Sequence, residues 1–534
     1  MKTELTGRSL VADVVLQDGG DAFHGVNPAS GENLEPAYVG IDPASVEAIA
    51  EQAQAAFVEY RSKSGAEKAA FLRAIADNIE AVVDDLVERM PAETGLPEPR
   101  VRGESARTMG QLRLFASLVE EGEWVDARIE TAIPDRQPLP KPDVRSMLQP
   151  LGPVVVFCAS NFPLAFSVAG GDTAAALASG CPVIVKAHHA HPGTAEIVGQ
   201  AIVAAVKSCG MPAGVFSLVY GSGRTVGTAL VQQPLIRAVG FTGSRAGGTS
   251  LMKVASQRPV PIPVYAEMSS INPVIILPGK LAASGEDIAK GLAGSVTLGV
   301  GQFCTNPGLV LLPSGEAADA FAKALCEALA GAEGCLLNSG IKSAYQNALA
   351  ARAEIQGDGV EVLHANPGDG ADAGCKVGSA LYKLSADAYL SNPVWAEEAF
   401  GPSTTLVTYE SEDDLIHIVH GLEGQLTGTI HGTDGDIEAA AEAISVLEQR
   451  VGRIIYGGFP TGVEVCHSMV HGGPYPSTSD GRSTSVGTMA IQRFTRAFCY
   501  QSAPESSLPA ELQDTNPQGI QRLVNGASTA DPIS

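Results

Sequence analysis

The sequence lacks three features that mark particular classes of protein: a long apolar run, an excess of basic residues and closely spaced cysteines. Its 534 residues include 35 lysines and arginines against 59 aspartates and glutamates, a formal net charge of −24. This charge argues against nucleic acid or an anionic membrane as a partner. No run approaches the roughly 18 apolar residues of a spanning helix, and the first residues form no apolar signal segment. We therefore expect a cytoplasmic protein.

The cysteines are too scattered to form a structural framework. There are nine of them, an odd number, and no two form a CxxC pair. This spacing excludes a disulfide scaffold and an ordinary zinc cluster. The histidines group only at 188, 189 and 191, without a thiol or carboxylate pattern around them. The sequence therefore predicts a polar loop there and no metal site.

Short apolar runs rich in β-branched residues alternate with helix-length segments through the middle of the chain. "GPVVVFCAS", "PVIVKA" and "VFSLVYG" are such runs, and a second alternating series begins at "INPVIILPG". Strands that alternate with helices are typical of βαβ units around a buried parallel sheet. The chain is also several times longer than an average domain. We therefore predict an α/β protein with two α/β domains and terminal extensions.

One cysteine, Cys304, stands in the glycine-spaced stretch "GVGQFCTNPG". A free cysteine is more often a small core residue than a nucleophile. Glu267 ends the apolar run "PVYAE", where a carboxylate is costly unless it has a function. Asn161 follows another strand, so its amide can donate a hydrogen bond to a developing oxyanion. Glu398 and Phe400 lie in the acidic and aromatic stretch "WAEEAFGP". Together these stretches favour the nucleophile.

The same motifs, in this order and with this spacing, resemble those of the aldehyde dehydrogenase superfamily over nearly the whole chain. They are Asn161-Phe162-Pro163, Lys186, Phe241 to Ser244, Glu267, Gly301-Gln302 ahead of Cys304, and Glu398 to Pro402. The resemblance implies an aldehyde dehydrogenase-like α/β fold, with a Rossmann-type dinucleotide-binding domain, an α/β catalytic domain and a β oligomerisation arm.

The resemblance also implies domain boundaries. They are residues 1–124 and 148–266 for the dinucleotide-binding domain, 125–147 and 487–502 for the arm, 267–486 for the catalytic domain, and 503–534 for a C-terminal tail. The tail is polar and contains proline, so we expect it to be loosely held or draped on the surface. The unpaired edge of the arm predicts a homodimer or a homotetramer.

The implied reaction is the oxidation of an aldehyde to an acid. Cys304 would attack the carbonyl as a thiolate, and Asn161 with the backbone N–H of Cys304 would hold the oxyanion. Glu267 would activate the water that hydrolyses the thioester, and it could take the thiol proton first. A thiol with a pKa of about 8.5 is mostly protonated at pH 7, so a base or dipoles are needed. No histidine lies near Cys304 in the sequence, which fits a glutamate-assisted site and leaves a spatial neighbour open.

The cofactor implied is NADP or NAD. The resemblance assigns contacts with it to Lys186, His189, Gly243, Ser244, Gly248, Glu398 and Phe400. The turn "FTGSRAGG" follows a strand and precedes a helix, which suits a pyrophosphate, although it is not the GxGxxG fingerprint. NAD-preferring members often carry an acid three places after the lysine, where this chain has His189. NADP should therefore be tolerated and is a candidate for the preferred cofactor. Alternatively, His189 is a solvated loop residue and both cofactors bind.

The substrate class can be inferred from the branch of the family that the sequence resembles and from the residues expected to line the substrate tunnel. Ser269 and Ser270 stand after Glu267-Met268 where many members of the family carry glycines, and the segment "VEVCHSMVHGGPYPSTSDGRSTSVG" replaces the family's usual glycine-rich closing segment. These departures resemble a branch with α-ketoglutarate semialdehyde dehydrogenases and an NADP-dependent fatty aldehyde dehydrogenase. A keto-acid aldehyde needs a cation for its carboxylate, and Arg107 in "SARTMGQLRLF" is our candidate, with Phe162 beside the reactive carbon.

Several alternatives stay open at this point. Arg107 could instead form a surface salt bridge with Glu104 or another acid. A fatty aldehyde, which wants an apolar tunnel, is the second substrate class. A CoA-acylating enzyme and a catalytically silent protein on the same fold are further options, but retention of Glu267 and Cys304 disfavours both.

Overall fold

A computed structural model describes residues 3–12, 16, 18–369 and 374–533 of the chain. Its first large sheet is a five-stranded parallel sheet with the strand order β7-β6-β5-β8-β9. The strands are β5 (Val154–Phe157), β6 (Val183–Lys186), β7 (Phe216–Val219), β8 (Ala238–Thr242) and β9 (Val264–Glu267). Every residue of β5 and β6 is buried, which explains their unbroken β-branched sequences.

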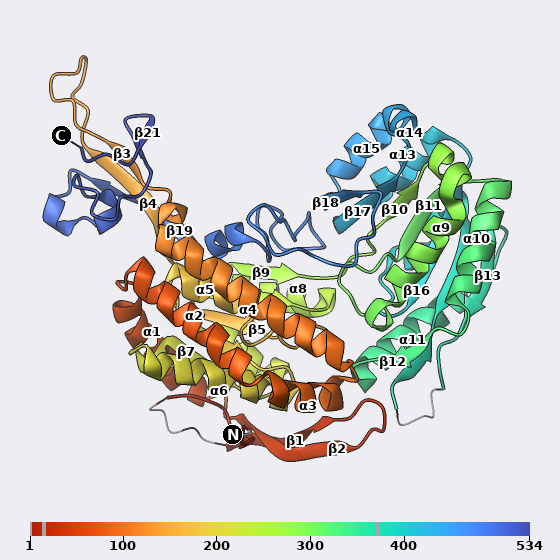
Figure 1. Cartoon of the computed structure of the whole chain (residues 1–534), viewed down its shortest axis with the longest axis horizontal. Coiled ribbons are helices and arrows are strands. Elements are labelled where there is room, and N and C mark those ends of the chain that lie inside the picture. Colours follow the sequence, from red (N-terminus) through yellow and green to blue (C-terminus); the bar gives the residue numbers. More distant parts are fainter. Residues whose placement is uncertain (1–2, 13–15, 17, 370–373, 534) are drawn as a thin grey trace.

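Helices cover both faces of this sheet, because alternate strand residues enter two different cores. Val154 and Val156 pack with helices of one face, and Val155 and Phe157 with helices of the other. The first face carries α2 (Gly65–Ala81), α3 (Val83–Thr94), α4 (Glu98–Glu121), α5 (Gly171–Ser179) and α6 (Pro192–Ser208). The second carries α1 (Ser45–Tyr60), α7 (Thr228–Gln232) and α8 (Arg245–Ser256). A hairpin of β1 (Asp18–Val26) and β2 (Asn33–Ile41) lies below this unit in Figure 1.

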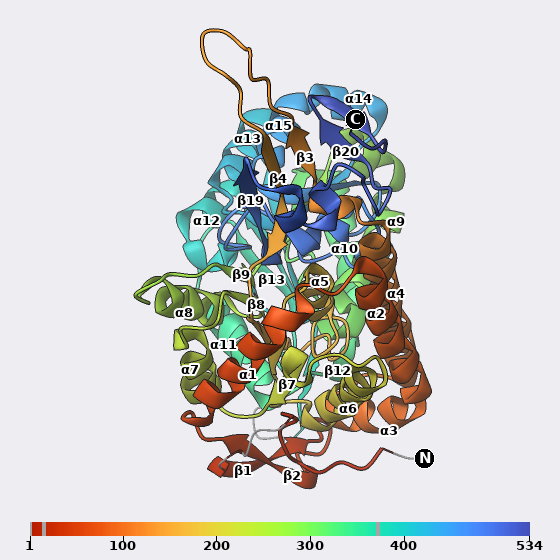
Figure 2. The same cartoon turned by 90° about the vertical axis from the view of Figure 1, so that its left-hand side faces the viewer.

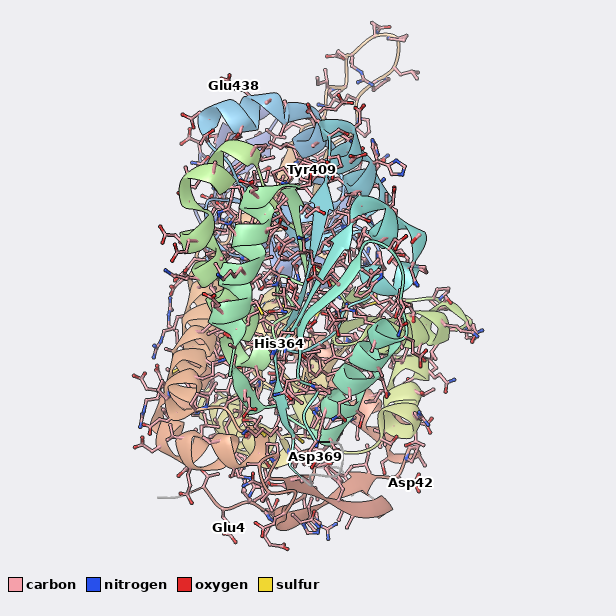
Figure 3. All side chains as sticks on the ribbon, turned by 90° about the vertical axis from the view of Figure 1, so that its right-hand side faces the viewer. Glu4, Asp42, His364, Asp369, Tyr409 and Glu438 are labelled. Atoms are coloured by element: carbon pink, nitrogen blue, oxygen red, sulfur yellow. The ribbon has the colours of Figure 1, made fainter. Side chains whose placement is uncertain are left out.

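The second large sheet has seven strands in the order β13-β15-β16-β11-β10-β17-β18. They are β10 (Val274–Ile276), β11 (Leu309–Pro313), β13 (Val360–Ala365), β15 (Ala380–Ser385), β16 (Ser403–Tyr409), β17 (Gln425–His431) and β18 (Val451–Tyr456). All neighbouring pairs are parallel except β13 with β15. Figure 3 shows this unit from outside, with Tyr409 at the end of β16.

This sheet also separates two cores. Val274 and Ile276 face α9 (Pro278–Thr297) and α10 (Glu316–Leu329), whereas Ile275 faces the opposite core. That second core contains α11 (Ser339–Ala353), α12 (Ala386–Ser391), α13 (Glu412–Gly421) and α15 (Ala441–Glu448). The short helix α14 (Asp434–Ala439) and the pair β12 (Glu333–Cys335) and β14 (Lys376–Gly378) complete the unit. The fold is therefore the predicted α/β fold with two sheets. The domain boundaries given above stay a prediction.

A third sheet projects from the body of the molecule (Figures 1 and 2). Its strand order is β19-β4-β3-β20-β21, and its elements are β3 (Arg128–Glu130), β4 (Val144–Pro150), β19 (Thr495–Gln501), β20 (Arg522–Val524) and β21 (Ala527–Thr529). The last two strands come from the C-terminal segment. Of the two expectations for the tail, loose attachment is therefore wrong, because the segment pairs with and packs on the arm.

Specific contacts fix that C-terminal segment against the arm. Leu512 is fully buried in a small core with Ile129 of β3. The buried Arg145 of β4 pairs with Asp143 at 3.0 Å and with Asp514 at 2.8 Å. Its Nη1 also donates to the Leu512 carbonyl at 2.6 Å. Composition does not reveal these partners, because the segment is polar and its burial depends on a strand far away in the sequence.

Candidate functional site

Cys304 lies in a loop that its neighbours fix tightly. The loop follows α9 and a turn in which Val300 has a φ of 57°, an unfavourable conformation for a β-branched residue. Gly301 is required beside it, because a Cβ there would lie 2.2 Å from the carbonyl carbon of Gly401. From the other side, the amide of Asn272 donates to the carbonyls of Cys304 and Asn306, each at 2.9 Å. The sulfur is thus presented from a rigid turn.

The structure places Cys304 next to Glu267, with a histidine between them. Nε2 of His471 lies 3.3 Å from Sγ of Cys304 and 3.0 Å from Oε1 of Glu267. The other carboxylate oxygen of Glu267 accepts a hydrogen bond from Oγ of Ser485 at 2.8 Å. Glu267 is the last residue of β9, as the sequence predicts. We call Cys304, His471, Glu267 and Ser485 the Cys304 cluster.

His471 is the residue that sequence reasoning missed. It lies 167 residues after Cys304 and belongs to the irregular segment that follows β18. Its backbone N–H donates to Oγ1 of Thr484 at 2.8 Å, and its carbonyl accepts from the N–H of Ser485 at 2.9 Å. The signal was the departure of this segment from the family's glycine-rich pattern. That departure indicates that this segment differs from its counterparts in the family, but it does not identify His471 as the side chain that reaches Cys304.

The protonation of the Cys304 cluster follows from its burial and its charges. Burial tends to raise the pKa of Glu267, but the neighbouring His471 and the hydrogen bonds from His471 and Ser485 outweigh it, so the pKa lies below its ordinary value. Burial and the nearby Glu267 carboxylate raise the pKa of the Cys304 thiol well above its ordinary value. At neutral pH the site therefore holds a thiol beside a carboxylate, and a base must remove the thiol proton before attack.

The hydrogen on Nε2 of His471 faces both groups. A carboxylate only accepts hydrogen bonds, so the 3.0 Å contact with Glu267 requires a proton on Nε2. The same N–H points within 3.3 Å of the sulfur, where it can stabilise a thiolate. Nδ1 is buried and has no partner in the described part of the chain.

Asn161 lies where an oxyanion donor is needed. Its Nδ2 donates to the carbonyl of Gln302 at 3.1 Å, two residues before Cys304. This bond uses one amide hydrogen and leaves the second available. Phe162 packs edge-to-face on Phe303 with ring centroids 5.2 Å apart, and the Arg100 guanidinium lies 4.4 Å from the Phe162 ring. The structure thus brings Asn161 and Phe162 to the Cys304 loop.

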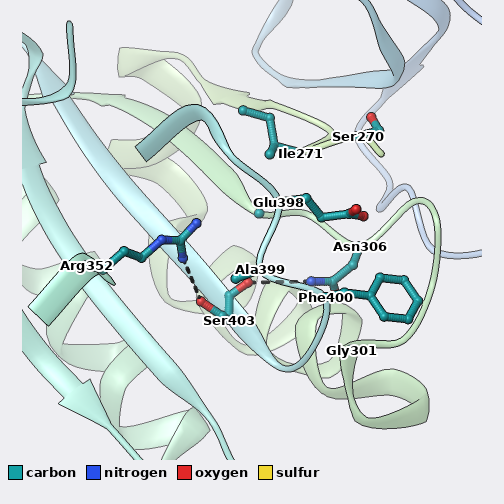
Figure 4. Close-up of a pocket in the computed structure, with 10 residues that line it drawn as sticks. Ser270, Ile271, Gly301, Asn306, Arg352, Glu398, Ala399, Phe400 and Ser403 are labelled. Carbon is teal, nitrogen blue, oxygen red and sulfur yellow. Dashed lines mark hydrogen bonds between the residues drawn. The ribbon is translucent and has the colours of Figure 1, made fainter. Parts of the chain in front are cut away.

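Glu398 and Phe400 lie on a pocket at the other side of the Cys304 loop. In Figure 4 the Glu398 carboxylate and the Phe400 ring project to the same side, away from Arg352. Burial raises the pKa of Glu398 to about 7, and hydrogen bonds from Ser269 and from the backbone N–H of Ser270 oppose the shift. The two serines that depart from the family pattern therefore hold this carboxylate.

A cleft of about 570 Å³ continues from Glu398 toward α8. Ser244 caps α8 by accepting from the N–H of Gly247 at 3.2 Å. Gly243 donates its N–H to the carbonyl of Glu267 at 3.1 Å, which ties this turn to the end of β9. At Gly248 a Cβ would lie 2.6 Å from the sulfur of Met268 and 3.3 Å from the Cβ of Ala266, so glycine lets α8 lie close to β9 without displacing the Met268 side chain.

Lys186 and His189 lie together at the carboxyl end of β6. Lys186 is buried, and burial lowers its pKa to about 8. Its Nζ donates to the carbonyl of Ala187 at 2.9 Å. His189 is exposed and stacks on His188 with ring centroids 4.5 Å apart. A cation and an exposed imidazole therefore stand at the edge where parallel sheets bind dinucleotides.

Arg107 is partly buried on α4 and is not paired with Glu104. Glu104 instead pairs with Arg100, at 3.2 Å, and accepts from two backbone N–H groups. Arg107 donates to the carbonyl of Val463, and its buried Nε has no partner among the described residues. It lines an open cavity of about 610 Å³ with Glu464 and others. Within the described residues, Arg107 therefore forms no salt bridge with Glu104 or with another acid.

A second arginine reaches the same region. Burial lowers the pKa of Arg453, and the charge of Cys304 opposes this shift. Arg453 donates to the carbonyls of Pro460 and Gly462, both at 3.3 Å, and its buried Nε has no partner within the described chain. The charge of Arg107 likewise lowers the pKa of the Cys304 thiol. Arg107 and Arg453 therefore each bring a positive charge, and an Nε–H without a hydrogen-bond partner in the described chain, close to the Cys304 sulfur.

The molecule combines a parallel sheet of the dinucleotide-binding type with a second α/β unit, and Cys304 and Glu267 lie close together in its site. This combination defines the class of NAD(P)-dependent oxidoreductases whose cysteine sulfur attacks a carbonyl carbon. The chain belongs to the aldehyde dehydrogenase family, which matches residues 15–496. It is therefore an enzyme that oxidises aldehydes with NAD(P). None of the helices in the described part of the chain has the length and apolar character that crossing a membrane requires.

Two relatives cover almost the whole chain. Alpha-ketoglutaric semialdehyde dehydrogenase 2 of Azospirillum brasilense is 51% identical over 525 residues, 98% of this chain and 99% of that protein. Alpha-ketoglutaric semialdehyde dehydrogenase of Acinetobacter baylyi is 45% identical over 486 residues, 91% of each. Among solved structures, a 3,6-anhydro-L-galactose dehydrogenase in complex with NAP has a TM-score of 0.78 at 21% identity, with 92% of this chain and 99% of that one covered. The last similarity supports the fold alone.

Proposed function

We propose that this aldehyde dehydrogenase converts α-ketoglutarate semialdehyde to α-ketoglutarate. The observation that carries the proposal is the 51% identity, over nearly full length, to a relative named for this substrate. The two arginines near the sulfur, Arg107 and Arg453, supply the cations that a keto-acid substrate needs at the end away from its aldehyde.

Cys304 carries the substrate through the reaction. Glu267 takes the thiol proton directly, the N–H of Nε2 of His471 stabilises the thiolate, and the thiolate adds to the aldehyde carbon. The second amide hydrogen of Asn161 and the backbone N–H of Cys304 hold the resulting oxyanion. Bound NAD(P) supplies the hydride acceptor. Glu267 then removes a proton from the water that releases the acid from the thioester.

The cofactor residues fit the two ends of a dinucleotide. Glu398 offers partly buried carboxylate oxygens for the nicotinamide ribose hydroxyls, and Phe400 lines the same pocket. Ser244 stands at the N-terminus of α8, where a pyrophosphate is favoured. Lys186 and His189 offer cationic and polar contacts for the adenosine ribose, and no carboxylate lies between them in the sequence to repel a 2′-phosphate.

The affinity for NADP is expected to fall above pH 8, and that for NAD to change less. Lys186 has a pKa of about 8, so it is charged at pH 7 and loses its charge as the pH rises through that value. A 2′-phosphate depends on this charge more than a hydroxyl does. Dissociation constants for both cofactors between pH 6.5 and 9.5 test this expectation. Lys186→Met should remove the difference in pH dependence, and Lys207→Met, a change at an exposed lysine of α6, should keep it. Equal pH profiles for both cofactors in the unaltered enzyme would remove Lys186 from the phosphate site.

Arg107→Met is expected to raise KM for α-ketoglutarate semialdehyde about 10- to 100-fold and to leave KM for a neutral aliphatic aldehyde nearly unchanged. The reason is the loss of one charge-assisted hydrogen bond to the substrate carboxylate. Arg102→Met is the matched control, because Arg102 lies on the same helix but outside the cavity that Arg107 lines and pairs with Asp84 and Glu98 at the surface. An unchanged KM for the keto-acid aldehyde would place Arg107 outside the substrate site. Preference for long aliphatic aldehydes in the unaltered enzyme would contradict the substrate proposed here.

We also propose that the arm joins copies of the chain into a homodimer or a homotetramer. β19 is the outermost strand of the arm sheet, so one of its edges has no partner in the described chain. Such an edge is suited to pairing with another chain. Mass measurement by light scattering in solution distinguishes these states from a monomer.

A further inference from the structure

The Cys304 cluster has the composition and spacing of a metal site with one open position. A carboxylate oxygen of Glu267, the sulfur of Cys304 and a ring nitrogen of His471 all lie within 4.8 Å of one another. Zinc binds thiolate sulfur, imidazole nitrogen and carboxylate oxygen, and three protein ligands with a free fourth position are a common arrangement. No sequence motif marks this group, because the three residues come from β9, the loop after α9 and the segment after β18.

The distances are close to those that zinc requires. Zinc lies about 2.0 to 2.3 Å from such ligands, so ligand atoms around a tetrahedral ion are about 3.3 to 3.7 Å apart. Nε2 of His471 lies 3.0 Å from the Glu267 oxygen and 3.3 Å from the Cys304 sulfur. The Cys304 sulfur and the Glu267 oxygen lie within 4.8 Å of each other. Movements of up to about an ångström would therefore admit the ion. The same nitrogen faces both other ligands, so a metal would replace the proton that now lies among them.

The surroundings favour a cation. A thiolate and a carboxylate together balance the charge of a divalent ion, and both lie in a buried site where charges interact strongly. Ser485 donates to the carboxylate oxygen that does not face His471, which orients Glu267 as an outer-shell partner does. The sulfur is less deeply buried than the carboxylate and the imidazole, so the fourth position of the ion would lie on the more exposed side of the site and can take water.

We propose that Glu267, Cys304 and His471 form a binding site for a thiophilic divalent cation such as Zn²⁺, and that this ion reversibly silences the enzyme. On binding, the Cys304 thiol releases one proton to solvent and its sulfur forms a bond to the metal. The proton on Nε2 of His471 moves to Nδ1, which has no partner in the described chain to hold it in one tautomer. No electron transfer is involved. The metal occupies the sulfur lone pair that would attack the aldehyde, so metal and substrate exclude each other.

Calorimetric titration of the full chain with Zn²⁺, in the absence of substrate and cofactor, tests the site directly. We expect one tight equivalent per chain, with affinity lowered at least about 100-fold in Cys304→Ser and in His471→Asn, and about 10-fold or more in Glu267→Gln. Cd²⁺ should give an ultraviolet thiolate-to-metal charge-transfer band that is absent in Cys304→Ser. Circular dichroism and thermal melting identify any variant that fails to fold.

Matched controls come from the same irregular segment as His471. Cys466→Ser and His467→Ala remove a thiol and an exposed imidazole outside the cluster and should leave Zn²⁺ affinity unchanged. Zn²⁺ should also protect Cys304 from modification by a thiol reagent, and removal of the ion with EDTA should make the thiol reactive toward that reagent again. Tight binding that persists in Cys304→Ser and His471→Asn, or equally weak binding in all chains, would overturn the proposal. These measurements involve no turnover, so they fail or succeed independently of the substrate proposed above.

Discussion

A Cys304→Ser chain is expected to lose aldehyde-dependent NAD(P)H formation by about 10⁴-fold or more, while it still folds and binds cofactor. An alcohol is far less acidic than a thiol, so neither Glu267 nor His471 can produce enough alkoxide at neutral pH. Serine is also similar in size, so the Asn272 hydrogen bond to the backbone of residue 304 is kept. The loss should therefore appear in kcat and not in stability.

Steady-state kinetics with purified protein and cofactor-binding titrations measure the two expectations separately. Cys466→Ser is the control, since Cys466 is also a free, partly exposed thiol but lies outside the Cys304 cluster. Its activity should stay within about twofold of the unaltered enzyme. Turnover in Cys304→Ser near that of the unaltered enzyme would remove the sulfur from the reaction and with it the proposed function.

The residues that could be predicted from the sequence are those next to regular elements. Glu267 closes β9 and Lys186 closes β6, and both strands stand out in the sequence as short apolar runs. In a parallel sheet the carboxyl ends of neighbouring strands meet at one edge, so a polar residue at the end of a predicted strand is a site candidate from the sequence alone. The fold was predictable for the same reason, because alternating strands and helices are a local signal.

His471 and the C-terminal strands were not predictable, because their partners are distant in the sequence. The segment that carries His471 has no regular structure to reveal which side chain points inward, and Thr484 and Ser485 fix it through hydrogen bonds. β20 pairs with β3, which lies almost four hundred residues earlier in the chain. Short strands of this kind have too little hydrophobic periodicity to stand out from loops.

Substitutions of Glu267 and of His471 are expected to affect the kinetics in different ways. Glu267→Gln is expected to lower steady-state turnover about 10² to 10⁴-fold, because the thioester then lacks a base to activate water. Hydride transfer precedes that step, so a burst of up to one equivalent of NAD(P)H per site should remain, slowed at neutral pH because the thiol has also lost its base, and followed by a much slower phase. His471→Ala should slow the burst as well, since the thiolate loses the N–H that lies 3.3 Å from its sulfur, but it should leave thioester hydrolysis by Glu267 intact.

The pH dependence of the burst separates the two roles further. Loss of a donor to the thiolate raises the pKa of Cys304, which burial and Glu267 already hold well above the ordinary value. The burst rate of His471→Ala should therefore reach its plateau at a higher pH than that of the unaltered enzyme. Stopped-flow absorbance of NAD(P)H formation between pH 6 and 10 measures this shift, and His467→Ala is the matched control in the same segment. If Glu267→Gln abolished the burst and His471→Ala left both its rate and its pH profile unchanged, Glu267 alone would activate the sulfur and His471 would only hold Glu267 in place.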